Sequence, residues 1–267
     1  MEEVRISEVT AENVEDLCRV CIPPERIADP AFTKGREEKR KWAQEMLRMW
    51  GGCAKLAYVG STPVGLIQYK PVPKERVVYI HCIFVHEKEH WRKGIGKRLL
   101  ANLIEDMRRP RAWFDGQPAL ALVTKTFPGE LPDQYPARQF FKGKGFQQVG
   151  EDPDYLYYPL EEGFVYPPGQ EEEACYIPQG EDRGKAVIIY GPSFCPFAYV
   201  FLVKAAQVVK EIIPGIPVRW ISRSGEPGEV EKRGGFEGCV VNARPIKSFV
   251  LDREAFQREV VEAWQMS

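Results

Sequence analysis

The sequence predicts an α/β protein with two domains. Segments of alternating apolar and polar residues, which favour strands, are interleaved with segments whose apolar residues would share one helical face. A stretch rich in proline, glycine and glutamate at residues 161–184 interrupts this pattern and indicates a linker. The chain of 267 residues is long enough for two domains, which we expect at residues 1–160 and 185–267.

The first domain is predicted to mix strands and helices. Strand patterns occupy residues 4–10, 54–59, 64–72, 77–85, 119–127 and 155–160. Helix patterns occupy residues 11–21, 33–50, 95–107 and 136–146, with Thr10 as the expected N-cap of the first. The buried face of the third helix is expected to hold Ile95, Leu99, Leu103, Ile104 and Met107.

The second domain is predicted to follow the order β-α-β-β-β-α. Strands are expected at residues 185–190 and 216–221, around a helix at residues 196–213. A hairpin within residues 238–251 precedes a last helix, for which Asp252 is the expected cap.

Charge and cysteine content exclude several classes of protein. A net charge of −1 argues against general nucleic-acid binding, which needs a basic surface. No apolar run approaches the roughly 18 residues of a membrane span, and the first residues lack the apolar segment of a secretion signal. Seven cysteines, an odd number, indicate thiols in a reducing cytoplasm. Cys18 and Cys21 form a C-x-x-C pair, but a zinc site needs two more ligands and no second such pair exists, so we expect no metal.

A short glycine-containing loop lies between a predicted strand that ends at Val85 and the helix at residues 95–107. Gly94 and Gly96 would let the backbone approach an anion closely, and the first N–H groups of the helix would face it. The phosphate-binding spacings G-x-x-x-x-G-K-[ST] and G-x-G-x-x-G are both absent. The loop is therefore either a phosphate site or a tight turn with a solvated basic rim.

The surrounding residues resemble the GNAT N-acetyltransferase superfamily. Its [QR]-x-x-G-x-[GA] pattern matches "WRKGIG" except that Trp91 replaces Gln or Arg, and "ARQFFKGKGF" is similar to its later helix. The resemblance covers residues 1–160 and implies a mixed, mostly antiparallel sheet flanked by helices. It also implies acetyl-CoA as co-substrate, an amine of a small molecule or of a peptide as acceptor, and direct attack of the amine. The resemblance implies that the strand splays near Phe84 and Val85 and that the backbone N–H of Val85 is the oxyanion donor. The implied donor-binding residues are Phe84, Val85, Arg92, Lys93, Gly94, Ile95, Gly96, Lys97 and Arg98.

The sequence lacks the groups that usually move protons in this superfamily. Phe141 stands where the superfamily often has a tyrosine acid, and the strand at residues 77–85 holds no glutamate. His81 is the hypothesised general base, with a hydrogen-bonded core histidine as the alternative. Strand alternation would put Tyr79, His81, Ile83 and Val85 on one face. Tyr135 is the candidate acid, and Tyr155 and Tyr157 are weaker ones.

Cys195 lies between a predicted strand and helix, where a thiolate is favoured. The segment "CPFA" resembles the C-P-[YF]-C turn of glutaredoxins without its second cysteine, and Glu237-Gly238 replaces the proline expected before the hairpin. The whole chain is similar to acetyltransferases with a C-terminal YoaP-like, thioredoxin-like domain. The sequence thus predicts a cytoplasmic N-acetyltransferase, for which a homodimer is one allowed assembly. The alternatives are a non-catalytic acyl-CoA-binding regulator and a monothiol redox protein centred on Cys195.

Overall fold

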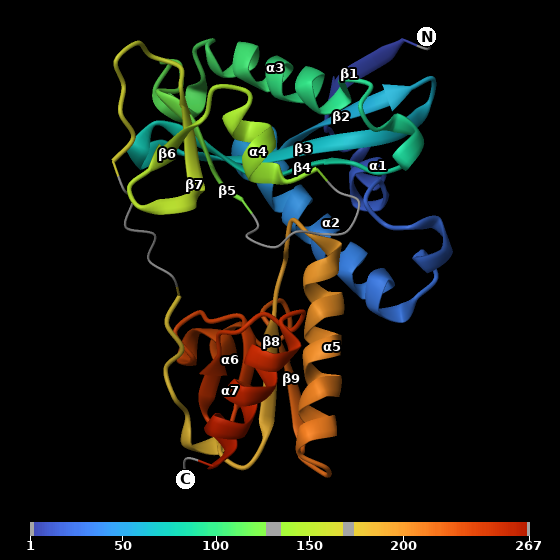
Figure 1. Ribbon diagram of the computed structural model, residues 1–267, viewed down its shortest axis with the longest axis vertical. Helices are drawn as coiled ribbons and strands as arrows, with labels where there is room; N and C mark the ends of the chain where they lie inside the picture. Colours follow the sequence, from blue (N-terminus) through green and yellow to red (C-terminus); the bar gives the residue numbers. More distant parts are fainter. Residues whose placement is uncertain (1–2, 127–134, 168–173, 266–267) are drawn as a thin grey trace. The chain divides into compact units, whose positions relative to one another are not determined.

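The computed structural model describes residues 3–126, 135–167 and 174–265 (Figure 1). The chain divides into two compact units, each of which is discontinuous in sequence. The first unit comprises Met1–Cys21 and Ala43–Gln170, and the second comprises Ile22–Trp42 and Glu171–Ser267. The acidic run Glu171–Glu173 of the predicted linker lies outside the described residues.

The first unit contains a seven-stranded sheet in the order β1-β2-β3-β4-β5-β7-β6. Every neighbouring pair is antiparallel except β4 and β5, which confirms the mixed, mostly antiparallel sheet. The strands are β1 Val4–Glu8, β2 Ala54–Val59, β3 Thr62–Val72, β4 Val77–Val85, β5 Ala121–Lys125, β6 Gln147–Val149 and β7 Asp152–Pro159. The helices within residues 1–160 are α1 Val14–Arg19, α2 Pro30–Trp50, α3 Ile95–Met107 and α4 Ala137–Lys142, and α2 belongs to the second unit up to Trp42.

Helix α3 lies along one face of the sheet (Figure 1) and supplies much of the apolar core. Ile95, Leu99, Leu103 and Met107 are buried and Ile104 is partly buried, as the helical spacing predicts. Each fully buried side chain of this kind stabilises the fold by about 1.5–3 kcal/mol. This packing fixes the N-terminal end of α3 beside the end of β4.

A β-bulge interrupts the pairing of β3 with β4. Gln68 pairs with Cys82 and Tyr69 with Ile80, so His81 is the extra residue on β4. The bulge changes which side chains share a face. Before it Tyr79 packs with the cluster that contains Val77, whereas after it Ile83 and Val85 pack against the core under α3. The predicted common face of Tyr79, His81, Ile83 and Val85 is therefore wrong, because the bulge shifts the alternation.

Two further details differ from the sequence predictions in the first unit. Helix α1 begins at Val14, four residues after Thr10, and Asn13 is its N-cap without a side-chain capping bond. The Asn13 side chain instead accepts a hydrogen bond from the Thr10 N–H at 2.8 Å, because the chain turns before the helix starts. The short edge strand β6 was not predicted, since its three residues are mostly exposed and carry no apolar pattern.

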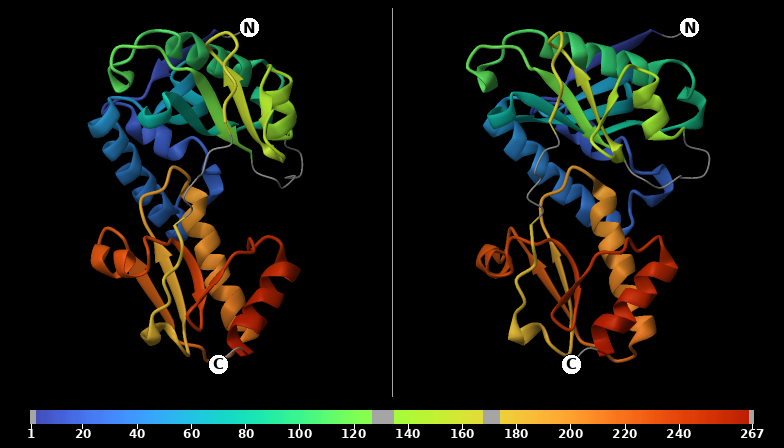
Figure 2. Two further views of the ribbon diagram at one scale, coloured as in Figure 1. Left: turned by 90° about the vertical axis from the view of Figure 1, so that its left-hand side faces the viewer. Right: turned by 60° about the vertical axis from the view of Figure 1, so that its left-hand side comes forward.

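The second unit contains a four-stranded sheet in the order β11-β10-β8-β9, where only β8 and β9 are parallel. Its elements are β8 Ala186–Tyr190, α5 Pro196–Ile212, β9 Val218–Ser222, α6 Pro227–Lys232, β10 Gly238–Val241, β11 Arg244–Ile246 and α7 Arg253–Gln265. Helices α5 and α7 pack on one face and α6 on the other (Figure 2). Asp252 caps α7 as predicted, since its side chain accepts from the Ala255 N–H at 3.2 Å. Helix α6 was missed because it is only six residues long and follows a Gly-Glu-Pro sequence.

A buried ion pair joins the segment that precedes β8 to the end of α6. Arg233 and Asp182 are both fully buried and are joined by two hydrogen bonds of 2.7 and 2.8 Å. The Tyr176 hydroxyl donates to Asp182 at 2.7 Å. The described helices include none that is both long and apolar enough to cross a membrane.

Candidate functional site

The two central strands of the first unit separate at the bulge. The β4–β5 ladder runs from Val77 to Ile80 on β4 and from Ala121 to Thr124 on β5, while β4 itself continues to Val85. The opening thus begins directly after Ile80, earlier than the splay expected near Phe84 and Val85. Among the described residues no strand pairs with this edge of β4 after Ile80, and a strand edge of this kind can pair with the backbone-like groups of a ligand.

The backbone of Val85 is directed toward this opening. The N–H of the next residue, His86, donates to the Val64 oxygen of β3 at 3.1 Å. Successive backbone groups of a strand point to opposite edges, so the Val85 N–H and C=O face away from β3. The indole Nε1 of Trp91 donates to the Val85 oxygen at 2.9 Å. Trp91, the departure from the superfamily pattern, therefore fastens the loop to the end of β4.

The loop after β4 leads into α3 through two residues with positive φ. Arg92 has φ 60° and Gly94, the N-cap of α3, has φ 76° with no side-chain capping bond. The first intrahelical bond runs from the Arg98 N–H to the Gly94 oxygen, so the N–H groups before it have no acceptor within the helix. Ile95 is buried, so only its backbone can contact a ligand.

Gly96 faces an aromatic ring from α4. A Cβ added at Gly96 would lie 3.5 Å from the Phe140 ring, which is ordinary contact with little space beyond it. The absence of a side chain at this position lets Phe140 and Ile83 lie close to the first turn of α3. A helix N-terminus of this kind, with close backbone approach, suits a phosphate group.

The basic residues around the loop fall into two groups. Arg92, Lys93 and Lys97 are exposed and can reach an anion at the start of α3. Arg98 instead donates to the Val4 oxygen of β1 at 2.6 Å, which ties the helix to the sheet. Arg98 was predicted as a donor-binding residue, but this bond directs its guanidinium to β1.

His81 occupies the bulge at the start of the opening. Its ring lies 5.3 Å from the Tyr79 ring, and the Lys70 ammonium lies 5.6 Å over Tyr79. Burial, and to a lesser degree the charge of Lys70, lowers the pKa of His81 to about 3. The imidazole is therefore neutral at pH 7, which corrects the expectation of a base that titrates near neutrality.

The tyrosines considered as acids have different surroundings. Tyr135 is 68% exposed and lies just before α4. The Tyr157 hydroxyl donates to Gln147 at 2.9 Å, and the Tyr155 hydroxyl lies 3.2 Å from the Tyr166 hydroxyl. Phe141 is buried against Phe146 in the core. Tyr135 is thus the most accessible of these phenols.

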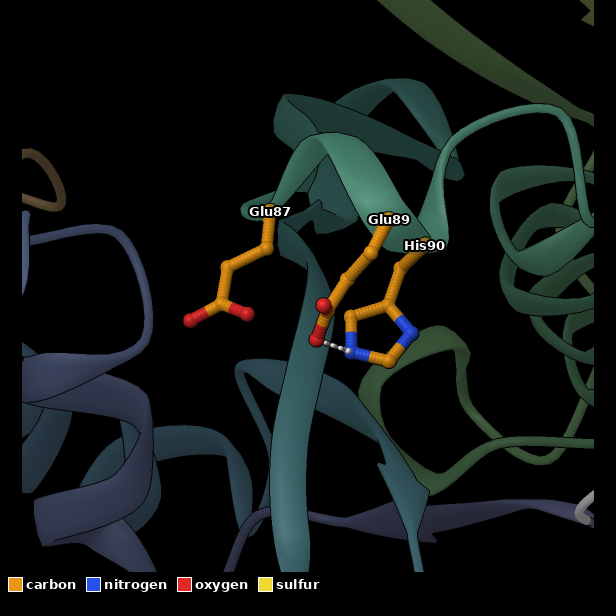
Figure 3. Close-up of side chains that lie close together, drawn as sticks. All are labelled: Glu87, Glu89 and His90. Atoms are coloured by element: carbon orange, nitrogen blue, oxygen red, sulfur yellow. Dashed lines mark ion pairs between the residues drawn. The ribbon is translucent and has the colours of Figure 1, made fainter.

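Three polar side chains gather on the loop between β4 and α3 (Figure 3). Glu87, Glu89 and His90 place their ligand atoms within 4.8 Å of one another, and Glu89 lies 3.3 Å from His90 Nε2. Together with residues of β3 they line a depression of about 240 Å³. Both glutamates are exposed, and no other group of this kind is found in the described residues, so Cys18 and Cys21 do not join one. Exposed acidic groups of this kind are common without a metal.

The turn that holds Cys195 is covered within the second unit. Cys195 is the half-buried N-cap of α5, and Phe32 of α2 packs on Phe197 with ring centroids 4.9 Å apart. A Cβ at Gly35 of α2 would lie 2.1 Å from the Pro196 oxygen, so the helix backbone rests on the turn. The C-P-F turn is therefore a packing surface for α2.

Glu237 and Gly238 stand at the position where a thioredoxin-like site has its proline. Gly238 has φ 152°, and a Cβ there would lie 2.8 Å from the Phe236 ring. The neighbouring Glu237 forms a short ion pair with Arg223, and its carboxylate lies where a Cβ at Gly191 would project. Side chains thus fill the space next to the Cys195 turn.

Sequence reasoning missed two residues of the candidate site. Trp91 was treated only as a mismatch to the superfamily pattern. It lies between the end of β4 and the glycine-containing loop, and its indole N–H is a potential hydrogen-bond donor. Lys70 gave no signal, because its position beside His81 depends on the pairing of β3 with β4.

Comparison with known proteins gives one family match and several similar solved structures. Residues 22–127 match the sequence model of the acetyltransferase (GNAT) family, and no curated protein matches the chain. Similar solved structures include Ard1 from Thermoplasma volcanium, with 16% identity, 60% of this chain and 99% of that chain covered, and a TM-score of 0.41. Another is the PaiA N-acetyltransferase from Thermoplasma acidophilum in complex with coenzyme A, with 15% identity, 59% and 99% coverage, and a TM-score of 0.40. A third is a GNAT family acetyltransferase from Brucella melitensis in complex with acetyl-CoA, with 16% identity, 64% and 95% coverage, and a TM-score of 0.40. This match covers less than half of the chain, so the chain is similar to the acetyltransferase (GNAT) family over residues 22–127.

Proposed function

We propose that the protein transfers an acetyl group from acetyl-CoA to an amine by direct attack. The observation that carries this proposal is the opening between β4 and β5, with the Val85 N–H directed into it and the N-terminus of α3 next to it. A thioester and a pyrophosphate need these two features side by side: a strand edge for the acyl arm and a helix N-terminus for the phosphates.

Backbone groups provide most of the donor site in this proposal. The N–H groups at the start of α3 bind the pyrophosphate, and Arg92, Lys93 and Lys97 add charge. Val85 presents its backbone groups at the edge of β4 to the pantetheine arm, with Phe84 next to it, and the Val85 N–H stabilises charge on the thioester oxygen. Acetyl-CoA supplies an activated acyl group, so the protein needs only to position the reactants and move protons.

His81 acts on the amine after attack has begun. A neutral imidazole with a pKa of about 3 is too weak to deprotonate a free ammonium ion. The attacking nitrogen becomes far more acidic as its bond to the acyl carbon forms, and His81 then accepts its proton, directly or through water. Tyr135 is the acid that returns a proton to the leaving thiolate, since its phenol is exposed at the start of α4.

Calorimetry with acetyl-CoA tests the donor site. The wild type is expected to bind and Gly96→Glu to lose binding, because a carboxylate would enter the first turn of α3. Release of CoA thiol over many turnovers with an amine separates the enzyme from the alternative of a non-catalytic acyl-CoA-binding regulator. Binding without turnover across an amine panel would favour the regulator.

We also propose that the C-terminal segment is a thioredoxin-like domain without redox activity. The order β11-β10-β8-β9, with α5 after β8, supports that fold, and the contact of α2 with the Cys195 turn argues against a monothiol site. The assignment of residues 1–160, 161–184 and 185–267 to acetyltransferase, linker and YoaP-like domain is part of this proposal. None of the seven cysteines forms a disulfide, which suits a cytoplasmic protein.

A further inference from the structure

We infer that the acceptor is an amine that carries a carboxylate a few bonds from its amino group, and that Lys70 binds that carboxylate. This inference rests on the proposed acetyl transfer, and it concerns the acceptor rather than the donor. It names an amino acid or a similar small amino carboxylate as the substrate class. Lys70 thereby becomes a specificity-determining residue.

The first line of evidence is the arrangement of three side chains on adjacent strands. Lys70 of β3 pairs directly with Tyr79 of β4, and its ammonium lies 5.6 Å over the Tyr79 ring. The Tyr79 ring in turn lies 5.3 Å from His81. The cation, the aromatic ring and the imidazole thus follow one another on one side of the sheet, beside the opening of β4.

The second line of evidence is the charge of Lys70. Two lysines of this unit have carboxylate partners: Lys55 pairs with Glu8 and Asp106, and Lys125 with Asp152. No carboxylate of the described residues forms an ion pair with Lys70, which is exposed. An ammonium that is held over an aromatic ring and has no anion beside it is suited to an anionic group of a ligand.

The spacing restricts the size of the acceptor. Two ring contacts in series, of 5.6 and 5.3 Å, set the upper limit of the path from Lys70 to His81. A ligand that bonds to both groups forms one hydrogen bond of about 3 Å at each end of that path. The ligand itself therefore spans only the distance that remains between the two bonds. An amino group and a carboxylate separated by a few bonds fit this span, with the ligand's carbon atoms on the face of Tyr79.

Binding of a carboxylate at Lys70 also favours the chemistry at His81. The positive charge of Lys70 is one cause of the low pKa of His81. A ligand carboxylate next to Lys70 would offset that charge and make the imidazole a better proton acceptor. An acceptor amide, which has no charge, would leave the imidazole as it is.

The test compares amino acids with their carboxamides as acceptors. The probes are paired L-amino acids and L-amino acid amides, phenylalanine and phenylalaninamide among them, measured with saturating acetyl-CoA. The variants are Lys70→Gln and, as a matched control, Lys74→Gln, which removes an exposed lysine four residues away. We expect the wild type to prefer the acids, and Lys70→Gln to lose about 10- to 100-fold in kcat/KM for them, mainly through KM. For the amides, kcat/KM of Lys70→Gln should equal that of the wild type. Lys74→Gln should have the kcat/KM of the wild type for acids and amides alike.

Calorimetry separates failure of this inference from failure of the proposed function. Acetyl-CoA is titrated first, and the amino acid is then titrated into the protein saturated with CoA. Donor binding with equal use of acids and amides, or with no effect of Lys70→Gln on the acids, would overturn the inference alone. If no acceptor turns over, amino acid binding that depends on Lys70 supports it, and no binding overturns it. Absence of acetyl-CoA binding would overturn the proposed function itself.

Discussion

The indole Nε1 of Trp91 donates a hydrogen bond to the carbonyl oxygen of Val85 at 2.9 Å. This bond joins the loop that precedes α3 to the last residue of β4, whose own N–H is the proposed oxyanion donor. The plane of a peptide fixes the direction of its groups, so holding the Val85 oxygen limits rotation at the end of the strand. The residue that departs from the superfamily pattern thus supports the strand edge directly.

Replacement of Trp91 by phenylalanine should therefore lower activity more than stability. The variant keeps an aromatic ring but loses one hydrogen bond, at a cost of about 1 kcal/mol in unfolding free energy. We expect kcat to fall severalfold. The matched control is Trp113→Phe, which removes a 2.6 Å bond to the Trp50 oxygen away from the opening. Equal loss of activity in the two variants, measured by steady-state kinetics, would speak against a role of Trp91 in the site.

Two substitutions at Gly96 should have opposite consequences for acetyl-CoA binding. Alanine adds a Cβ in ordinary contact with Phe140, so Gly96→Ala should bind within a fewfold of the wild type. Glutamate adds length and a negative charge at the N-terminus of α3, where the phosphates are proposed to lie, and binding should fall at least about 100-fold. Calorimetric titration measures both. Tight binding by Gly96→Glu would contradict the placement of the pyrophosphate.

The low pKa of His81 predicts a dependence of stability on pH. Its pKa is about 3 in the folded protein, against an ordinary value of 6.5. Between these values the unfolded chain binds a proton that the folded protein does not, so stability falls as pH drops below 6.5. His81→Gln removes this contribution, so its Tm should fall less between pH 7 and pH 5 than the Tm of the wild type does. His86→Gln is the control, and an unchanged slope in His81→Gln would refute the buried neutral imidazole.

Gly35 provides a test of the contact between α2 and the Cys195 turn. Glycine to alanine in a helix usually stabilises by roughly 0.5–1 kcal/mol. At Gly35 the new Cβ would meet the Pro196 oxygen at 2.1 Å, so Gly35→Ala should instead lower Tm and speed alkylation of Cys195. Gly180→Ala, which meets no atom within 4 Å, is the control. A Gly35→Ala variant that is more stable than the wild type would show that α2 does not rest on this turn.

Removal of Arg233 should destabilise the second unit strongly. Arg233→Met would leave the Asp182 carboxylate buried without its cation, which costs about 3–5 kcal/mol. Arg219→Met removes a partly exposed guanidinium that pairs with Glu229, and should cost about 1 kcal/mol or less. Urea unfolding measures the loss of unfolding free energy in each variant. Similar midpoints for the two variants would contradict a larger contribution of the buried pair to stability.

Local sequence was sufficient for most elements of both units. The apolar spacing of Ile95, Leu99, Leu103 and Met107 predicted α3 because a helix places these residues on one face whatever it packs against. Gly94 predicted the turn before α3, since the φ of 76° found there favours glycine. The cap at Asp252 was also readable, because a cap and its N–H group are only a few residues apart.

Features that depend on residues distant in sequence were decided only by the tertiary structure. The bulge at His81 arises from the register of β4 against β3, and it moves Ile83 and Val85 away from the face of Tyr79 to which strict alternation assigns them. The neighbourhood of Lys70 and Tyr79, the packing of Gly35 on Pro196, and the bond from Arg98 to Val4 likewise join separate segments. Sequence patterns record which face of an element is apolar, whereas the pKa of His81 and the access to Cys195 depend on what that face meets after folding.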